Sequence, residues 1–176
     1  MKKCVILVGP PGSGKTTIAH QVFDTHTYIN QDIQGKEHLH NFDMAVLAGE
    51  DVIIDRMNFN KLQRSRYLDI AKTNGYETEI VVIHESYKTC LERCLKRQDH
   101  PTIKDEQSAR SALATFFGKY ERVQDEEADK VTRIWPEGDK PLAAISDLDG
   151  TLCMGMLVWV PAGRREPIQS PTCGAA

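Results

Sequence analysis

The chain has 176 residues, of which 40% are hydrophobic and 27% are charged, and its formal net charge at pH 7 is −3. This length fits one ordinary domain of roughly 100 to 200 residues plus a remainder, and the average composition argues against intrinsic disorder. The near-neutral charge excludes a broad basic surface that would coat duplex nucleic acid, but it leaves room for a small basic site.

Strand-like and helix-like segments alternate along most of the chain. Short apolar runs predict strands at 4–8, 27–30, 51–55 and 77–85, and 128–136 is a weaker candidate. Helical spacing of apolar residues predicts helices at 15–23, 35–49, 61–74, 86–98 and 104–122. Such alternation is typical of an α/β fold with a parallel sheet and helices on both of its faces.

A phosphate-binding loop follows the first predicted strand. The segment GPPGSGKTT at 9–17 fits the pattern GxxxxGK[ST], and its position between a strand and a helix separates it from an incidental glycine-rich turn. In such a loop backbone N–H groups bind phosphate, the lysine reaches the β and γ phosphates, and the Thr hydroxyl contacts Mg²⁺. We therefore predict an ATP and Mg²⁺ site formed by Gly9, Gly12, Ser13, Gly14, Lys15, Thr16 and Thr17.

Two aspartates follow the second and third predicted strands, whose carboxyl ends should border the same crevice as the phosphate loop. Asp32 is positioned to orient an attacking hydroxyl and accept its proton as a general base. The alternative is that Asp32 caps the next helix. Asp55 lies where a Walker B acid contacts Mg²⁺ or its waters, and the alternative is a polar side chain that ends a strand. Asn58 nearby carries no signal by itself.

Two arginines occupy the predicted helix at 86–98. Arg93 and Arg97 are four residues apart, so they should share one helix face, and the segment 98–101 should end the helix at its proline. The arrangement resembles the lid of a kinase, whose arginines stabilise charge on the transferred phosphoryl group. A basic helix end that only faces solvent or the helix dipole is the alternative.

Cysteine use and the N-terminal residues indicate a cytoplasmic protein. The five cysteines are scattered, with no CxxC pair and no histidine cluster at zinc spacing. Cys90 and Cys94 are interpreted as small buried side chains on one helix face. The apolar start is too short for a signal or membrane segment and leads directly into the glycine loop. We therefore expect a soluble protein with no membrane partner.

Together these motifs resemble the 5′-polynucleotide kinase family, particularly its bacteriophage form, in which a kinase domain precedes a 3′-phosphatase domain. The resemblance covers roughly residues 1–153 and rests on GPPGSGKTT, INQD, VIIDRMNFNKLQRSRY and the arginine pair. It implies a phage-encoded repair enzyme that transfers the γ-phosphate of ATP to a DNA or RNA 5′-OH end, at a single strand or a nick. Its catalytic residues would be Lys15, Asp32, Arg93 and Arg97.

The sequence departs from the family pattern on the acceptor side. The family has Asn-Arg-Asp before the base, whereas this chain has Asn30, Gln31 and Asp32. Three residues beyond the base, the phage enzyme has an arginine that holds the acceptor's phosphate, and this chain has Gly35 followed by Lys36. Two positive charges of the family pattern are therefore absent from this side of the predicted site.

A second phosphate motif lies near the C-terminus. The segment ISDLDGTL resembles the first motif of haloacid-dehalogenase-type phosphatases, which implies Asp147 as nucleophile and Asp149 as acid/base. Their two-residue offset puts both carboxylates on the same side of an extended segment. Only 27 residues follow Asp149, whereas that fold needs about another 100 to bury its sheet. We expect a truncated remnant without 3′-phosphatase activity.

These motifs predict three regions. A P-loop NTPase kinase domain at 1–135 precedes a linker at 136–142 and a truncated phosphatase start with an irregular tail at 143–176. Two other functions stay open, namely a P-loop kinase for a sugar or nucleoside and a non-catalytic nucleotide-binding module. The choice between DNA and RNA depends on loop shape and 2′-OH contacts, and the oligomeric state is also left open.

Overall fold

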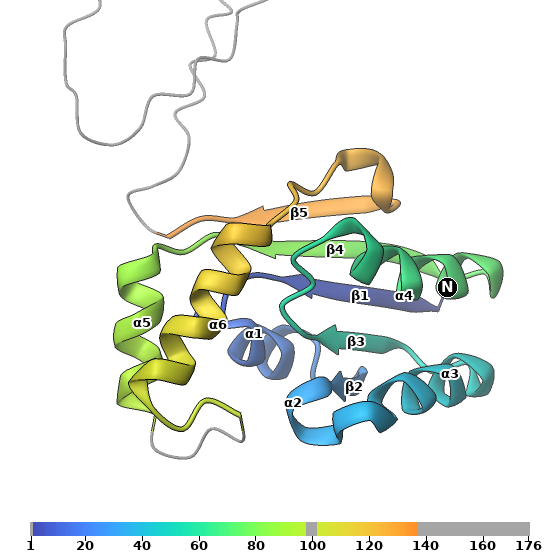
Figure 1. The fold of residues 1–176 in the computed structure, drawn as a ribbon. Coiled ribbons are helices and arrows are strands. Elements are labelled where there is room, and N and C mark those ends of the chain that lie inside the picture. The colour runs from blue at the N-terminus through green and yellow to red at the C-terminus, as the bar shows by residue number, and fades with distance from the viewer. Residues whose placement is uncertain (1, 98–101, 137–176) are drawn as a thin grey trace, which may run out of the picture. The chain divides into compact units, whose positions relative to one another are not determined.

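The computed structural model describes residues 2–97 and 102–136. Within them, five parallel strands form a sheet in the order β2-β3-β1-β4-β5 (Figure 1). The strands are β1 (Lys3–Val8), β2 (Thr27–Asn30), β3 (Val52–Asp55), β4 (Glu77–Ile83) and β5 (Lys130–Ile134). The parallel sheet predicted from alternating segments is thus confirmed, and 128–136 contributes its edge strand.

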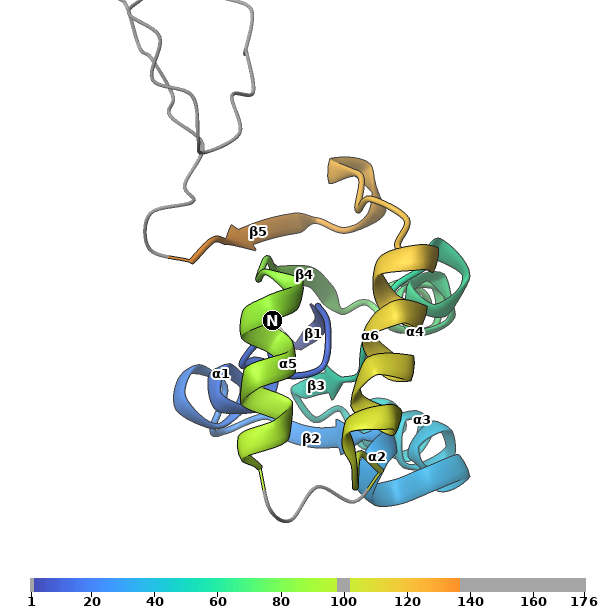
Figure 2. The ribbon, with the colours of Figure 1, turned by 60° about the vertical axis from the view of Figure 1, so that its left-hand side comes forward.

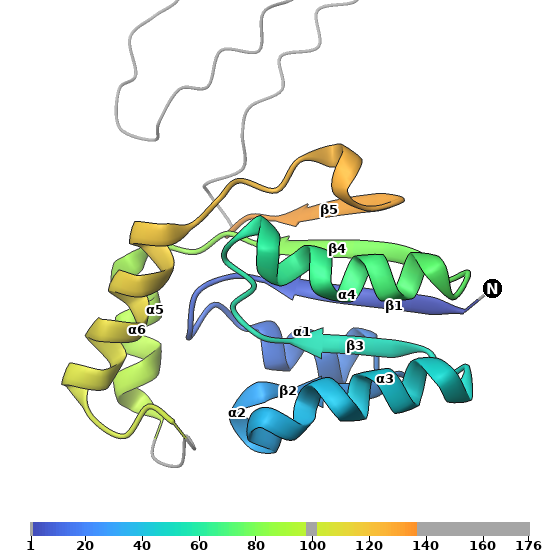
Figure 3. The same ribbon diagram turned by 45° about the vertical axis from the view of Figure 1, so that its right-hand side comes forward.

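Helices cover both faces of the sheet, as predicted. They are α1 (Lys15–Val22), α2 (Gln31–Gln34), α3 (His38–Ala48), α4 (Lys61–Thr73), α5 (Tyr87–Lys96) and α6 (Glu106–Lys119), with 3-10 turns η1 (Gly35–Glu37) and η2 (Asp125–Glu127). Figure 3 shows α3 and α4 in front of the sheet and α1 behind it. This arrangement explains why the strands are almost continuously apolar, since both sides are covered.

Two apolar clusters, one on each face, hold the layers together. Ile6 and Ile54 pack with residues of α3 and α4, whereas Leu7 and Ile53 pack with Ala19 of α1. Neighbouring residues of one strand therefore enter different clusters, because successive side chains of a strand point to opposite faces. The central strand β1 is fully buried from its second residue onward.

Helices α5 and α6 lie side by side at the carboxyl ends of the strands (Figures 1 and 2). Each begins after a capping residue, because the Ser86 hydroxyl accepts from the Thr89 N–H and the Asp105 carboxylate accepts from the Ser108 N–H. Cys90 and Cys94 face inward and are buried as free thiols, as predicted. This helix pair forms one wall above the sheet edge where the phosphate loop lies.

The helical segment after β2 begins earlier than the sequence indicated. The Asn30 side chain accepts from the Ile33 N–H, so α2 starts at the strand's end and passes through η1 into α3. Gly35 adopts a positive φ of 58°, which allows the bend between them. Asp32 consequently lies in the first turn of α2, where Asn30, and not Asp32, is the cap.

The compact unit of the structure runs over Met1–Trp135. The predicted phosphatase residues Asp147 and Asp149 and the segment 143–176 lie outside the described residues, so the proposed division into regions stays a prediction. Across 2–97 and 102–136, no helix combines the length and apolarity needed to cross a membrane.

A buried ion pair ties α4 to the segment before β5. The Arg64 guanidinium, which is fully buried, donates from Nε and Nη2 to Glu127 at 2.7 and 3.0 Å. Its Nη1 donates to the carbonyls of Asn58 and Glu121. Burial acts to raise the pKa of Glu127, but hydrogen bonds from Arg64 and from the Gln124 backbone outweigh it and hold this pKa below its ordinary value.

Breaking this pair should be costly. We expect Arg64→Leu to lower the free energy of unfolding by about 3 to 5 kcal/mol, because it removes the buried guanidinium that compensates the charge of the Glu127 carboxylate. Urea denaturation measures the loss. The control is Arg110→Ala, which breaks an exposed pair with Glu106 on α6 and should change stability little. An equal loss of unfolding free energy in the two variants would show that the buried pair stabilises the fold no more than the exposed pair.

Candidate active site

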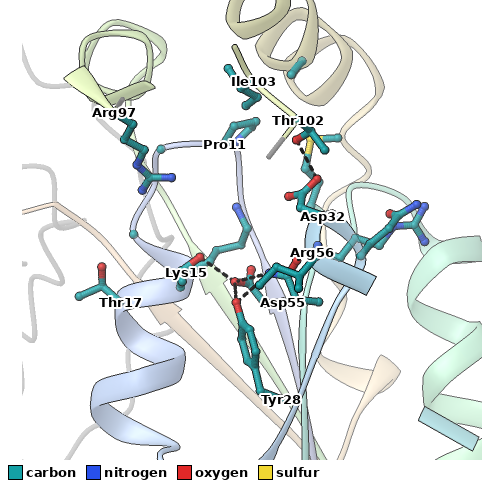
Figure 4. Close-up of a pocket in the computed structure, with 18 of the residues that line it drawn as sticks. Pro11, Lys15, Thr17, Tyr28, Asp32, Asp55, Arg56, Arg97, Thr102 and Ile103 are labelled. Atoms are coloured by element: carbon teal, nitrogen blue, oxygen red, sulfur yellow. Dashed lines mark hydrogen bonds between the residues drawn. The ribbon is translucent and has the colours of Figure 1, made fainter. Parts of the chain in front are cut away.

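A cleft of about 550 Å³ opens at the carboxyl edge of the sheet (Figure 4). Its walls come from the phosphate loop, from α2 and the end of β3, and from the segments around α5 and α6. The predicted site residues that line it are Gly12, Gly14, Lys15, Thr16, Thr17, Asp32, Asp55 and Arg97. The other predicted residues, Gly9, Ser13 and Arg93, are not part of this lining.

Two positions of the phosphate loop favour glycine because of their backbone conformation, and at one of them packing also leaves no room for a side chain. Gly12 has a φ of 80°, and a Cβ there would lie 2.6 Å from the carbonyl oxygen of Cys90 in α5. Gly14 has a φ of 96° and is the N-cap of α1. Left-handed backbone favours glycine at both positions. The N-terminus of α1 therefore points its free N–H groups into the cleft, as anion binding requires.

Lys15 is buried at the base of the loop. Its ammonium donates to the carbonyls of Gly9 and Pro10 at 2.9 and 2.7 Å. Burial lowers the pKa of Lys15, and the nearby Asp55 carboxylate partly offsets this effect. The Lys15 amine thus lies within the cleft, at the position where a P-loop lysine meets phosphate oxygens.

Asp55 at the end of β3 receives several hydrogen bonds. One oxygen, Oδ2, accepts from the Thr16 hydroxyl at 2.7 Å, the Tyr28 hydroxyl at 2.6 Å and the Asn30 amide at 3.2 Å. Burial, followed by the bond to Asp55, raises the pKa of Tyr28 above its ordinary range, so the phenol stays a donor. The carboxylate and the loop hydroxyl therefore lie together, as a Walker B acid and a P-loop Thr should.

This pair of oxygens fits Mg²⁺. Hard cations prefer oxygen ligands, and Mg²⁺ is usually bound by one or two carboxylates together with substrate phosphates and water. In the described parts of the chain, no group of three or more His, Cys, Asp and Glu side chains could form a metal site. The Thr16 hydroxyl beside the Asp55 carboxylate matches the small set of protein oxygens that Mg²⁺ uses.

Asp32 lies on the opposite side of the cleft from the loop (Figure 4). Its carboxylate is exposed on α2 and accepts a hydrogen bond from the Thr102 hydroxyl at 2.9 Å. Because Asn30 caps α2, the cap alternative does not explain why an acid occupies this position. The Asp32 carboxylate remains a candidate proton acceptor that faces the cleft.

The two arginines of the predicted lid diverge. Arg97, just past the end of α5, lines the cleft and points toward the phosphate loop (Figure 4). Arg93 instead pairs with Glu85 at 2.9 Å and donates to the Gly12 carbonyl at 3.4 Å. Arg93 therefore supports the loop from α5, whereas Arg97 is the arginine of this pair placed to reach a ligand.

Several polar lining residues were given no role by the sequence analysis, among them Tyr28, His20, Thr102 and Arg56. Tyr28 contacts Asp55, His20 packs its ring against Tyr28 at a centroid distance of 4.8 Å, and Thr102 bonds Asp32. Arg56, the residue after Asp55, lines the same cleft. The adjacency of Arg56 to a strand-end aspartate was a signal that could have identified it, but the other three are brought in only by folding.

Comparison with known proteins shows the family. Residues 34–122, half of the chain, match the family model AAA_33, described as an AAA domain. The chain belongs to this AAA domain family. The match begins after the phosphate loop, so the assignment of that loop in this AAA domain depends on its own residues and geometry.

Three curated proteins are similar in sequence to part of this chain. Transcription factor bHLH140 of Arabidopsis thaliana is 33% identical over 54% of the chain. A candidate bifunctional polynucleotide phosphatase/kinase of Acanthamoeba polyphaga mimivirus is 29% identical over 48% of it. A candidate bifunctional polynucleotide kinase/RNA ligase of Autographa californica nuclear polyhedrosis virus is 26% identical over 87%. The chain spans 12%, 21% and 25% of the lengths of these three relatives.

Solved structures confirm the P-loop kinase fold. Kti12 of Chaetomium thermophilum, determined with ADP-AlF3, has a TM-score of 0.58 at 18% identity, with 78% of this chain and 90% of that one covered. A fungal RNA kinase has a TM-score of 0.55 at 18% identity, covering 75% and 38%. A gluconokinase from Sinorhizobium meliloti has a TM-score of 0.52 at 14% identity, covering 76% and 82%. At these identities the likeness concerns the fold alone.

Proposed function

We propose that this AAA domain protein is an ATP-dependent 5′-hydroxyl polynucleotide kinase that acts in nucleic-acid repair. The observation that carries the proposal is that Lys15, Asp32 and Arg97 line one cleft at the carboxyl edge of the sheet. A phosphate-binding loop with a lysine, a facing carboxylate and an arginine from a third element are the parts that phosphoryl transfer to a hydroxyl requires.

Each of these residues has a role in the proposed reaction. Asp32 orients the acceptor's 5′-hydroxyl and takes its proton as the oxygen bonds to the γ-phosphorus and the bond to the β-γ bridging oxygen breaks. The loop N–H groups and Lys15 bind the phosphates, and Arg97 stabilises the charge that spreads over the transferred group. The products are ADP and a 5′-phosphorylated end.

Mg²⁺ would be held by the Thr16 hydroxyl and, directly or through water, by Asp55. When bound, the ion neutralises phosphate charge and orients the β and γ phosphates. The Tyr28 and Asn30 bonds to Asp55 keep that carboxylate in place.

The acceptor class rests on the sequence motifs and the relatives. Two of the three curated relatives are described as polynucleotide kinases, and the motif order resembles that family. The runner-up is a kinase for a small molecule, favoured by the fold shared with the gluconokinase. A non-catalytic nucleotide-binding module is a third candidate, and the Asp32 carboxylate facing the loop argues against it.

The test is a transfer assay with γ-labelled ATP and Mg²⁺. Separate reactions contain 5′-OH DNA and RNA oligonucleotides, a 5′-phosphorylated oligonucleotide as control, nucleosides and simple sugars. We expect label on the 5′-OH oligonucleotides only. Label on a sugar or nucleoside with none on an oligonucleotide would establish the small-molecule kinase. ATP binding without label on any acceptor would establish the binding module.

Binding of an oligonucleotide should depend only moderately on salt. Single strands give a slope of log K against log salt of about −0.7 for each phosphate neutralised, and a cleft with few cations should neutralise few phosphates. We expect a slope shallower than about −5 for a single-stranded 5′-OH DNA, measured by fluorescence anisotropy from 50 to 300 mM salt. A steeper slope would reveal an extended basic track on the protein.

A further inference from the structure

Two arginines lie on opposite sides of the described cleft. Arg97 lies on the loop side, near Pro11 and Lys15, and Arg56 lies on the side of Asp32 (Figure 4). In a transfer between two bound molecules, the loop side receives the phosphate donor and the Asp32 side receives the acceptor. The position of Arg56 therefore assigns it to the acceptor. None of the site residues predicted from the sequence places a positive charge on that side of the cleft.

The sheet fixes where Arg56 emerges. Strands β2 and β3 pair in parallel with Asn30 opposite Asp55. The next residues along each strand are Gln31 on α2 and Arg56, so both leave the sheet edge side by side. The backbone of Arg56 is therefore held beside the helix that carries Asp32.

Two buried residues, Tyr67 and His38, link α4 to the bend after α2 by hydrogen bonds. The Tyr67 hydroxyl and His38 Nε2 are 3.0 Å apart, and His38 Nδ1 contacts the Gly35 carbonyl. Because a carbonyl can only accept, His38 must carry its proton on Nδ1 and accept at Nε2 from the Tyr67 hydroxyl. The positive charge of Arg56 acts on both groups of this pair, which places the guanidinium beside it.

The surroundings favour this neutral form of His38. Tyr67 is fully buried and His38 nearly so. Burial lowers the pKa of His38, the bond to the Gly35 carbonyl opposes this, and the charges of Arg56 and Arg66 lower the pKa further. The bonded Tyr67 and His38 therefore hold the bend after α2 in one arrangement beside the Arg56 guanidinium.

We propose that Arg56 binds a phosphate of the acceptor, next to the hydroxyl that Asp32 deprotonates, and that Tyr67 and His38 are its positioning residues. A guanidinium has five N–H donors in a fixed fork, which matches the oxygens of a phosphate. The acceptor it selects has a phosphate close to the reacting hydroxyl, as in a nucleotide with a 5′-OH and a 3′-phosphate. Neutral sugars and unphosphorylated nucleosides lack that group.

The inference explains the missing acceptor charges. Gly35 cannot supply one, and Lys36 is exposed on η1 and does not line the cleft. Arg56, which follows β3, binds the acceptor's phosphate in this inference. The family pattern assigns that role to an arginine after the base. This step rests on the proposed function, because it requires an acceptor hydroxyl beside Asp32.

The experiment compares acceptors and variants. For Arg56→Ala we expect the KM of a 5′-OH oligonucleotide to rise about 10- to 100-fold with a smaller change in kcat, because a charged hydrogen-bond partner of the bound substrate is lost. Arg56→Lys should recover part of the loss, and Lys36→Ala should match the wild type. Equilibrium binding of a 5′-OH dinucleotide 3′-phosphate, measured without ATP, should weaken by a similar factor in Arg56→Ala.

A second pair of variants tests the positioning residues. Tyr67→Phe keeps the ring that packs on Phe42 but removes the hydroxyl, and we expect the acceptor KM to rise while the KM for ATP does not. The matched control is Tyr76→Phe, a buried tyrosine whose hydroxyl bonds the Val46 and Glu50 carbonyls away from the cleft. It should lose stability without a change in acceptor KM.

The outcomes separate the two proposals. If the wild type labels oligonucleotides and Arg56→Ala has an unchanged acceptor KM, the phosphate assignment is wrong and the kinase proposal stands. It is equally wrong if the wild type uses an unphosphorylated nucleoside as well as its 3′-phosphate. Absence of label on every 5′-OH polynucleotide would instead reject the proposed function itself.

Discussion

Asp32→Asn is expected to reduce γ-phosphate transfer to an oligonucleotide by about 10² to 10⁴ while ATP binding stays nearly intact. The amide keeps the shape of the carboxylate and can still accept a hydrogen bond from the hydroxyl, but it cannot take up the proton. Asp32 lies across the cleft from the loop and bonds no loop residue. Nucleotide affinity should therefore be preserved, as titration with a fluorescent ATP analogue can verify alongside kcat.

Two further variants are compared with Asp32→Asn. Asp43→Asn makes the same chemical change on the exposed side of α3 and should leave kcat unaltered. Lys15→Ala should weaken nucleotide binding and turnover together, because its ammonium meets the phosphates in both the ground and the transition state. A wild-type kcat in Asp32→Asn would mean that another group accepts the proton and that the base is misassigned.

Arg97→Ala should lower kcat by a factor on the order of 10³ or more, with little effect on the KM of the oligonucleotide. Arginines that reach the transferred phosphoryl group act chiefly on charge that develops in the transition state. Of the two arginines predicted to form a lid, Arg97 is the one that lines the cleft and points toward the loop. Single-turnover kinetics with saturating ATP would measure the loss in the chemical step directly.

Arg93→Ala provides the contrast on the same helix. Its partners are Glu85 and the Gly12 carbonyl, so its removal should loosen the loop and raise the KM of ATP more than it lowers kcat. Lys96→Ala removes a neighbouring exposed charge that has no part in the cleft and should be silent. If Arg93→Ala and Arg97→Ala lose the same fraction of kcat, both arginines act on the transition state, and the division seen in the structure has no kinetic meaning.

Much of the fold could be predicted from the sequence because its signals are local. Apolar runs of strand length such as β1 and β4, each followed by helical spacing, indicate a parallel sheet without knowledge of any long-range contact. The largest displacement of a boundary, at α2, depends on a single side chain. Asn30 can end a strand or cap a helix, and only the folded chain shows that it does both.

The sequence by itself determined the phosphate loop, because nine consecutive residues carry its backbone geometry and its lysine, and it indicated the two strand-end acids because parallel strands end at one edge. Only the tertiary structure decided how those parts combine. It joined Thr16 and Tyr28 to Asp55, separated the contacts of Arg93 from those of Arg97, and placed Arg56 in the same cleft as Asp32. These are contacts between elements far apart in sequence, and the packing of α5 and the register of β2 on β3 set them.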